Sequence, residues 1–238
     1  MKAVLTGHSR GLGAAIGAEL LARGIPVLAL ARRANADLAA RFPQLLQQQE
    51  LDLGDPAALH AWLGSGALAA FLAGERQALL INNAGTVQPV GPAEAQDPLA
   101  VAQAVALNVS APLVLAAAIA RVPGEKRVLH VSSGAGRNAY PGWSVYCATK
   151  AALDHHARAA ALDAGHDLRV CSLAPGVIDT DMQAEIRSTS LDRFPIRERF
   201  EALKREGALT SPEDCARRLV DFLLSGKFGE QAVADLRD

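Results

Sequence analysis

The stretch "KAVLTGHSRGLG", residues 2–13, places an apolar run directly before a loop that holds three glycines. The run has the length of a buried strand, and the segment that follows has the pattern of a helix that ends at Gly24. A strand that passes through a glycine loop into a helix is the context in which such a loop binds the phosphates of a nucleotide. An ordinary glycine-rich turn is the alternative.

The same alternation of strand and helix continues along the whole chain. Further short strand candidates lie at residues 25–31, 45–52, 78–82, 127–133, 168–174 and 231–235. Alternating strands and helices predict right-handed crossovers and a mainly parallel sheet with helices on both faces. We therefore expect an α/β fold, one doubly wound Rossmann-type domain over residues 1–238 with seven strands. The weakest helix prediction is 56–73, because Gly64 and Gly66 interrupt its pattern.

The composition and charge of the chain indicate which kind of molecule it binds. The chain has 238 residues, half of them hydrophobic, and a formal net charge of -1 without any run of like charges. This argues against nucleic acid or an anionic membrane surface and favours a small-molecule partner. The first residues soon turn polar, and we expect no apolar run as long as a membrane span, which predicts a cytoplasmic protein.

The cysteines do not suggest a disulfide framework or a metal site. They are Cys147, Cys171 and Cys215. Their number is odd and their spacing is not that of metal ligands, so we expect them to pack as small residues in a reducing compartment. We predict no metal.

Each glycine of the first loop has a separate expected role. Gly7 permits the tight turn, Gly11 lets the backbone approach a pyrophosphate, and Gly13 allows the helix to pack closely on the strand. The remaining loop residues expected to contact the cofactor are Ser9, Arg10 and Leu12.

The end of the second predicted strand indicates which cofactor binds. An NAD-selective fold places an acidic residue there for the adenosine ribose, but this chain has Leu30 and Ala31 followed by Arg32 and Arg33. Guanidinium groups would bind a 2′-phosphate, and Arg10 could join them. We predict NADP rather than NAD, with a solvated loop as the alternative role of the two arginines.

Two further strand ends carry candidate cofactor contacts. Asp52, followed by Leu53, could accept a hydrogen bond from the adenine amino group or could simply form a turn. The fourth strand ends in "NNAG", in which the Asn83 side chain can bond to backbone of a neighbouring strand end. Ala84 and Gly85 are small enough for the cofactor to pass.

The stretch "SVYCATK" holds the candidate acid. A helix would place Lys150 one turn after Tyr146, on the same face. A free tyrosine titrates near ~10, and a unit charge about 4 Å away at a dielectric of about 20 is worth roughly 4 kcal/mol. We therefore expect Lys150 to lower the pKa of Tyr146 and make it a general acid. Two helix-surface neighbours without a catalytic role are the alternative.

Taken in order, the patterns TGxxxGxG, NNAG and YxxxK stand on successive strand ends, and the chain resembles the short-chain dehydrogenase/reductase family across its whole length. The resemblance implies a catalytic tetrad of Asn108, Ser133, Tyr146 and Lys150. Tyr146 would protonate a carbonyl oxygen as hydride arrives, and Ser133 would hydrogen-bond that oxygen. Lys150 would also bind the ribose hydroxyls. Ser132 is the alternative hydroxyl.

Asn108 has two readings. By the resemblance, it would hold a water that relays protons from solvent. Taken alone, it would be a polar residue in mid-helix or the cause of a kink.

The stretch "APGVIDT" is similar to the proline-glycine loop of that family. The resemblance implies that Pro175 and Gly176 bind the cofactor and that Val177 and Thr180 contact the nicotinamide amide. Residues 179–207 follow this loop, are rich in charges and include a helix-breaking proline, so we expect them to cover the substrate and to be mobile.

The C-terminal third resembles the sepiapterin reductase and benzil reductase branch of the family. This implies an NADPH-dependent carbonyl reductase whose substrate is an α-dicarbonyl compound, such as a diketone or a pterin side chain. Ser133 and Tyr146 would contact that substrate, and Asp235 would anchor a pterin. A 3-oxoacyl thioester reductase and a non-catalytic NADP-binding sensor are the alternatives.

Quaternary structure is an expectation from the resemblance alone. It implies a homodimer, with a homotetramer as the alternative. His155 and His156 would lie in the dimer interface or on a solvated face, and neither they nor His8 receive a catalytic role.

Overall fold

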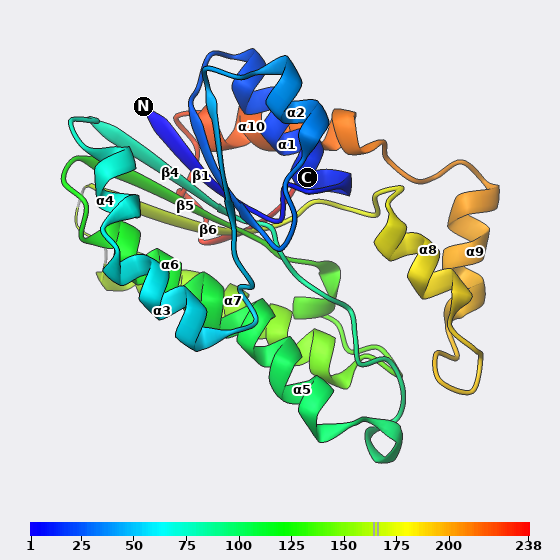
Figure 1. Cartoon of the computed structure of the whole chain (residues 1–238). Coiled ribbons are helices and arrows are strands. Elements are labelled where there is room, and N and C mark those ends of the chain that lie inside the picture. Colours follow the sequence, from blue (N-terminus) through cyan, green and yellow to red (C-terminus); the bar gives the residue numbers. More distant parts are fainter. Residues whose placement is uncertain (164, 166) are drawn as a thin grey trace.

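A computed structural model of the chain describes residues 1–163, 165 and 167–238. Its strands form one sheet in the order β3-β2-β1-β4-β5-β6-β7, and every neighbouring pair is parallel (Figure 1). The strands are β1 (Lys2–Thr6), β2 (Val27–Ala31), β3 (Leu46–Glu50), β4 (Gln77–Asn82), β5 (Glu125–Val131), β6 (Leu168–Ala174) and β7 (Val233–Asp235). The prediction of a doubly wound parallel sheet with seven strands is confirmed.

Helices connect successive strands and cover both faces of the sheet. They are α1 (Gly11–Ala22), α2 (Ala36–Arg41), α3 (Pro56–Gly64), α4 (Ala67–Leu72), α5 (Pro98–Val105), α6 (Ala111–Ala120), α7 (Ser144–Asp163), α8 (Asp181–Ser188), α9 (Arg197–Arg205) and α10 (Pro212–Leu224). Short turns are η1 (Ala93–Ala95), the π-helical η2 (Ala106–Ser110) and η3 (Gly134–Gly136). The interruption expected within 56–73 separates α3 from α4, where Gly66 has a φ of 79°.

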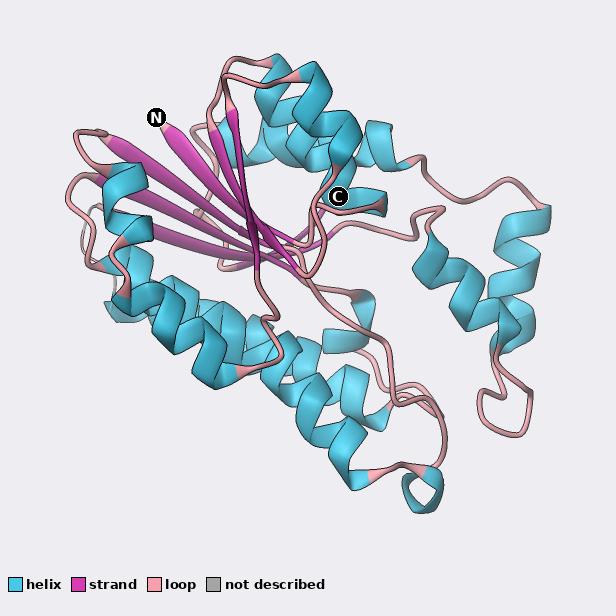
Figure 2. Cartoon of the chain, in the orientation of Figure 1, coloured by secondary structure: helices cyan, strands magenta, loops and turns pink. Residues whose placement is uncertain are grey.

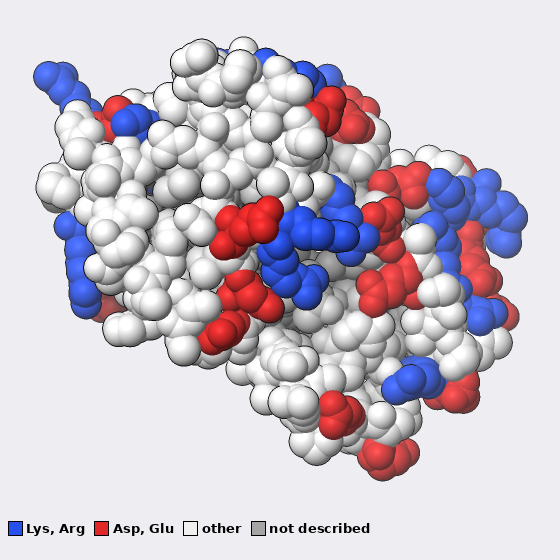
Figure 3. All heavy atoms as spheres, viewed as in Figure 1, with Lys and Arg blue, Asp and Glu red and all other residues white. Residues whose placement is uncertain are grey.

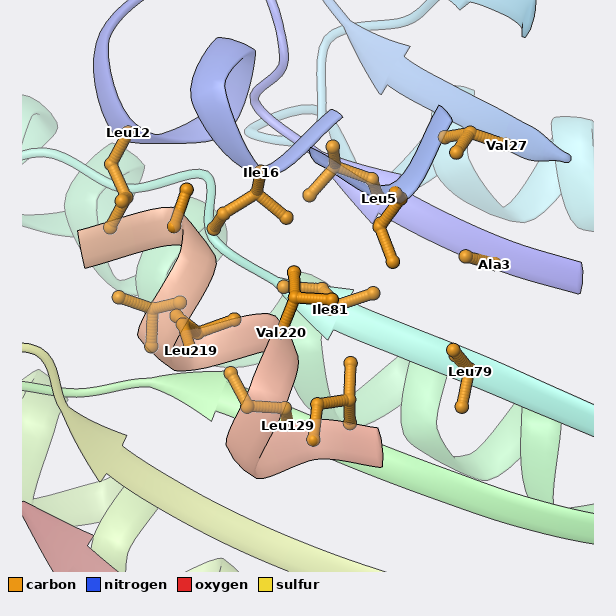
Figure 4. Packing of buried hydrophobic residues seen from close by; sticks show 14 of the residues in the cluster. Ala3, Leu5, Leu12, Ile16, Val27, Leu79, Ile81, Leu129, Leu219 and Val220 are labelled. Carbon is orange, nitrogen blue, oxygen red and sulfur yellow. The ribbon is translucent and has the colours of Figure 1, made fainter. Parts of the chain in front are cut away.

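Strand register divides the core into two layers. One row across the sheet faces α3, α4, α6 and α7 and consists of Leu28, Val4, Leu80, Val128 and Val170. The next row faces α1 and α10 and consists of Ala29, Leu5, Ile81, Leu129 and Cys171. Figure 4 shows Ile16 of α1 and Leu219 and Val220 of α10 over this second row. Because both faces are covered, the middle positions of the central strands β1, β2 and β4 are apolar on both faces.

Two strands end earlier than the sequence pattern predicts. β3 ends at Glu50, and β5 ends at Val131. Asp52 therefore lies in a turn, where its carboxylate accepts a hydrogen bond from the Gly54 amide at 2.9 Å. Ser132 and Ser133 follow β5 as loop residues.

One helical stretch among the described residues is long and apolar enough to cross a membrane. It runs from Pro98 to Ala120 and has a mean hydropathy of 1.9. The expectation that no apolar run reaches this length is therefore wrong. Leu115 and Ile119 on this stretch pack against the sheet in the layer that holds Leu80. A core helix passes the same test of length and composition, so the stretch is weak evidence for a membrane span.

Helices α8 and α9 extend beyond the carboxyl edge of the sheet (Figure 2). The two ends of this segment lie side by side. Ile178 and Thr210 form an isolated parallel bridge, and the Asp179 amide donates to the Thr210 carbonyl oxygen at 2.9 Å. Pro195 lies in the connection between the two helices. The segment is thus tied to the sheet at its base.

Candidate active site

A cleft of about 770 Å³ lies along the carboxyl edge of the sheet. Its walls contain nearly all residues that the sequence analysis singled out. These are Gly7, Ser9, Arg10, Gly11, Leu12, Gly13, Arg32, Arg33, Asp52, Leu53, Asn83, Ala84, Gly85, Ser133, Tyr146, Lys150, Pro175, Gly176, Val177 and Thr180. Asn108 and Asp235 are the predicted site residues that do not line it. Parallel strands bring their carboxyl ends to the same edge, which is why these separate loops meet.

The glycine loop has no room for side chains. An added Cβ on Gly13 would lie 2.0 Å from the Gly7 carbonyl oxygen, and one on Gly7 would lie 2.9 Å from the Ala84 Cα. Gly7 and Gly11 also have positive φ angles of 76° and 56°. Helix α1 starts after Arg10 without a side-chain cap. Its first amide groups are therefore available to an anion.

The loops after β1 and β4 are joined by hydrogen bonds. The Thr6 hydroxyl oxygen accepts from the amides of Asn83 and Ala84 at 2.9 and 3.0 Å. In return, the Asn83 side-chain amide donates to the carbonyl oxygens of Thr6 and Gly7 at 3.0 and 3.2 Å. These bonds hold the glycine loop in its conformation.

Three arginines line the cleft. Arg32 and Arg33 follow β2 and are exposed, and no carboxylate of the described residues lies within ion-pair distance of either. Arg10 is paired with Asp181, with 2.7 Å between Nη1 and Oδ2. Figure 3 shows Lys and Arg side chains gathered over the middle of this face, with acidic side chains on either side of them.

The proline-glycine loop lies beside the glycine loop. An added Cβ on Gly11 would be 3.4 Å from the Thr180 Cγ2, so the two loops are in near contact across the cleft. Gly176 has a φ of 88°, which favours glycine. The position agrees with the cofactor contacts that the family resemblance implies for Val177 and Thr180.

Tyr146 and Lys150 lie one turn apart on α7, as the spacing predicts. The Lys150 ammonium lies 5.7 Å from the centre of the Tyr146 ring and donates to the Val131 carbonyl oxygen at 2.8 Å. Both side chains are buried, at 8% and 6% exposure. The pair is therefore part of the cleft wall rather than of the helix surface.

The expectation that Lys150 lowers the pKa of Tyr146 is wrong in this structure. Burial raises the pKa of Tyr146 to about 12, although a hydrogen bond with Ser133 opposes the shift. Burial likewise lowers the pKa of Lys150 to about 8, and the Asp154 carboxylate opposes that shift. Removal of a phenolate from water is the largest cause of the raised pKa, and the Lys150 ammonium 5.7 Å from the ring centre does not reverse it. Tyr146 is thus a protonated donor at neutral pH. Of the two side chains, Lys150 has the pKa closer to neutral pH.

The two candidate serines have different partners. Ser133 is half-buried at the cleft, lies close enough to Tyr146 to oppose the rise of its pKa, and accepts a hydrogen bond from the Ala135 amide at 3.2 Å. Ser132 is buried and donates to the Asp154 carboxylate at 2.6 Å. Both serines line the cleft, but the Ser132 hydroxyl is bonded to Asp154; which of the two meets a substrate stays a prediction.

Asn108 lies behind the cleft in the π-helical segment η2. Its side-chain amide donates to the Thr86 carbonyl oxygen at 2.8 Å and to the Thr149 hydroxyl at 3.2 Å, and its oxygen accepts from the Thr86 amide at 2.9 Å. Asn108 therefore joins the loop after β4 to α7. Asn108 is a polar residue in mid-helix, within a π-helical turn, as one of its two readings has it, and the water relay stays a prediction.

Asp235 does not face the cleft. Arg237 binds its carboxylate with two hydrogen bonds at 2.8 and 2.6 Å, and Arg137 lies 4.0 Å away. Arg237 lines the cleft in its place. The structure therefore presents a guanidinium where the sequence analysis expected a carboxylate for a pterin.

The sequence analysis missed an aromatic wall next to Tyr146. Trp143 stacks on Phe194 at 4.6 Å between ring centres and lies 5.2 Å from the Tyr146 ring and 5.3 Å from the Phe200 ring. Trp143 and Phe200 line the cleft together with Tyr140. The signal "YPGWSVY" at residues 140–146 was available, but the phenylalanines come from the distant segment that carries α9.

The histidines and cysteines have packing partners outside the cleft. His8 is buried against the Gln48 side chain at 2.7 Å, and His156 lies 3.1 Å from His130. His155 is exposed. Cys171 and Cys215 pack in the core layer under α1 and α10.

The residues present fit a dinucleotide. The uncapped helix, the glycine loop that a Cβ would fill and the nearby arginines suit phosphates, and Lys150 and the proline-glycine loop lie at the other end of the same cleft. A doubly wound sheet with this site defines the class of nicotinamide-dependent oxidoreductases.

Comparison with known proteins identifies the family. A family model described as short chain dehydrogenase matches residues 1–191. A benzil reductase ((S)-benzoin forming) of Bacillus cereus is 35% identical over 240 residues, which covers 97% of this chain and 96% of the relative. A sepiapterin reductase of Meriones unguiculatus is 36% identical over 252 residues, or 99% and 95% of the two chains. The chain belongs to the short-chain dehydrogenase/reductase family.

A solved structure agrees. The crystal structure of a short-chain dehydrogenase/reductase from Burkholderia vietnamiensis is 50% identical, with a TM-score of 0.73, and covers 100% of this chain and 97% of its own. Members of this family are oxidoreductases that bind a nicotinamide cofactor.

Proposed function

We propose that this oxidoreductase is an NADPH-dependent carbonyl reductase that acts on aromatic α-dicarbonyl compounds. The observation that carries the proposal is the position of Tyr146, which lies near Ser133, has its ring centre 5.2 Å from that of Trp143, and lines the same cleft as the glycine loop. Aromatic substrates pack favourably on such a wall. Similarity to a benzil reductase and to a sepiapterin reductase supports the same class of substrate.

Each catalytic side chain would have a distinct task. NADPH, when bound, supplies the hydride. Ser133 would donate a hydrogen bond to the carbonyl oxygen, and Tyr146 would give it a proton. The raised pKa of Tyr146, about 12, keeps that proton on the phenol until the oxygen becomes basic. The Lys150 ammonium would then stabilise the phenolate that remains.

The choice of NADP over NAD rests on the arginines. Arg32 and Arg33 lie after β2, where a 2′-phosphate would meet two guanidinium groups and no carboxylate partner is found among the described residues. Arg10 is a third donor if it leaves Asp181.

We further propose that the segment 179–207 covers the substrate. Met182, Ile186 and Phe200 of this segment line the cleft, and Ile186 and Phe200 also pack in the cluster around Trp143 and Tyr146. A substrate would lie between these side chains and the sheet.

Four further expectations stay predictions. They are a fold of one domain, a homodimer, a cytoplasmic location and the absence of nucleic-acid or membrane partners.

The test is NADPH oxidation by the purified protein with a panel of carbonyl compounds. The panel contains benzil, an aliphatic diketone, sepiapterin, acetophenone and an acetoacetyl thioester. We expect benzil to give the highest kcat/KM and acetophenone to be much slower. The Tyr146→Phe variant should lose about 10²–10⁴-fold in kcat while its NADPH affinity stays within twofold.

The other outcomes separate the alternatives. A thioester that reacts faster than every diketone would assign the protein to 3-oxoacyl reduction. Tight NADPH binding without turnover of any compound would favour a sensor protein. A Tyr146→Phe protein that keeps its turnover would contradict the proposed acid.

A further inference from the structure

A buried carboxylate lies directly behind the catalytic residues. Asp154 is on α7, one turn after Lys150, and is 1% exposed. It does not line the cleft, so it touches neither cofactor nor substrate. Burial of a carboxylate costs free energy of desolvation unless the group is paired and hydrogen-bonded, so the partners of Asp154 indicate its role.

Asp154 connects the ends of two strands to the catalytic helix. Its Oδ1 accepts hydrogen bonds from the Ser132 hydroxyl at 2.6 Å and the Ser172 hydroxyl at 2.7 Å. These distances are usual for hydroxyl groups that donate to a carboxylate. Since Ser132 precedes Ser133, this contact anchors the end of β5 next to the hydroxyl proposed to meet the substrate.

The second oxygen of Asp154 faces positive charge. Oδ2 has no hydrogen-bond partner among the described residues, and the Arg137 Nε lies 3.6 Å from it. An added Cβ on Gly136 would lie 2.8 Å from this oxygen, so the loop packs directly on the carboxylate. Lys150 is on the same face of α7, four residues earlier.

We propose that Asp154 is a positioning residue that anchors Ser132 beside Ser133 and supplies a buried negative charge to the Lys150 ammonium. The proposal rests on the roles given above to Ser133 and Lys150. It explains why burial does not remove the charge of Lys150 at neutral pH, because Asp154 opposes the lowering of the Lys150 pKa.

The charged or titratable groups that face Asp154 are Lys150 of α7, Cys171 of β6 and Arg137 after η3. Ser132 after β5 and Ser172 of β6 face it as neutral hydrogen-bond donors. Asp154 and burial both raise the pKa of the Cys171 thiol, to about 12, so this thiol stays neutral. Arg137 and Lys150 are therefore the cations that share the Asp154 charge.

Two variants should move the pH profile in opposite directions. Asp154→Asn keeps the size of the side chain but removes its charge, so Lys150 should lose its proton at lower pH. We expect the basic limb of kcat/KM to shift down by about one pH unit, the size of effect typical of one close charge. Activity should approach that of the wild type near pH 6. Arg137→Gln, which does not touch the cleft wall, should shift the same limb up.

Further variants separate charge from packing. Ser172→Ala removes one hydrogen bond but no charge, so its basic limb should stay in place. Asp221→Asn, an exposed carboxylate on α10 that pairs with Arg23, is the matched control and should resemble the wild type. Equal loss of activity by Asp154→Asn at all pH values would show a merely structural role and overturn the proposal.

An NMR titration tests the charge coupling without turnover. The side-chain signals of Lys150, assigned by their loss in Lys150→Met, should titrate at lower pH in Asp154→Asn and at higher pH in Arg137→Gln. If Asp154→Asn does not fold, the shift of the Lys150 titration in Arg137→Gln still tests the charge coupling. An unmoved Lys150 titration overturns the inference, whereas coupled titration in a protein that reduces no carbonyl would contradict only the proposed function.

Discussion

The Arg10 guanidinium and the Asp181 carboxylate form an ion pair that joins the glycine loop to the start of α8. The Nη1 and Oδ2 atoms are 2.7 Å apart, and both side chains are more than half exposed, at 62% and 69%. Exposed ion pairs contribute little to stability, so this pair can exchange at small cost. A bound 2′-phosphate would compete with Asp181 for Arg10.

Removal of the Asp181 charge should strengthen cofactor binding. In Asp181→Asn, Arg10 is free for the phosphate and a nearby negative charge is gone, so the Kd for NADPH should fall about two- to fivefold, as expected for an exposed pair. Fluorescence titration at low and high salt measures this. Glu185→Gln on the same helix, which contacts Gln88 outside the cleft, should bind like the wild type. An unchanged Kd in Asp181→Asn would argue against competition for Arg10.

Replacement of the arginines after β2 should remove the cofactor preference. A charged hydrogen bond to phosphate is worth about 1.5–3 kcal/mol. The double variant Arg32→Ala/Arg33→Ala should therefore raise the Kd for NADPH by about 30-fold or more and change the Kd for NADH less than twofold. Arg41→Ala is the control, because Arg41 pairs with Asp37 on α2 away from the cleft. Equal kcat/KM with both cofactors in the wild type would refute the NADP assignment.

Reductase activity should fall as the pH rises through about 8. Lys150 has a pKa of about 8 and Tyr146 of about 12, so Lys150 is the first of the two to lose its proton. Only the charged form stabilises a phenolate, and activity should be full below this pKa. The pH dependence of kcat/KM for benzil measures it. A profile that stays flat to pH 10 would contradict the role of Lys150.

Buried His130 should make the fold sensitive to acid. Burial lowers the pKa of His130 to about 3, whereas the unfolded residue titrates near 6.5. Below pH 6.5 the unfolded chain binds more protons, so the free energy of unfolding should drop by about 2 kcal/mol between pH 7 and pH 5. Urea unfolding at both pH values measures the drop.

The matched variants are His130→Gln and His155→Gln. The first should lose most of the difference between the two pH values, even if it is less stable at both. The second removes an exposed histidine and should keep the difference. A drop of the same size in His130→Gln would place the acid sensitivity elsewhere.

Two glycines should respond in opposite ways to a methyl group. Gly13→Ala would bring a Cβ to 2.0 Å from the Gly7 carbonyl oxygen, so we expect a loss of about 3 kcal/mol in unfolding free energy and weak NADPH binding. Gly64→Ala on α3 meets nothing within 4 Å and should gain about 0.5 kcal/mol. Denaturant unfolding compares them. A stable Gly13→Ala protein would mean that the loop can open without loss of structure.

Much of the site could be read from the sequence because its signals are local. The spacing from Gly7 to Gly13 describes one turn and the start of one helix, and four residues from Tyr146 to Lys150 describe one helical turn. Such short spacings have few conformations. The loops then meet because parallel strands end at one edge of the sheet.

Other features depend on contacts between distant segments. The aromatic wall brings Phe194 and Phe200 onto Trp143 across some fifty residues of chain. Arg137 approaches the Asp235 carboxylate to 4.0 Å from nearly a hundred residues earlier in the chain. No pattern along the chain indicates either contact.

The sequence by itself determined the parallel sheet, the glycine loop and the order of the candidate catalytic side chains, since periodicity and short spacing are properties of the chain. The tertiary structure decided the protonation of Tyr146 and Lys150, the separate partners of Ser132 and Ser133, and the burial of Asp154 against Ser132 and Ser172. The physical reason is that a pKa depends on the water and charge around a group. Those surroundings exist only after distant segments have packed.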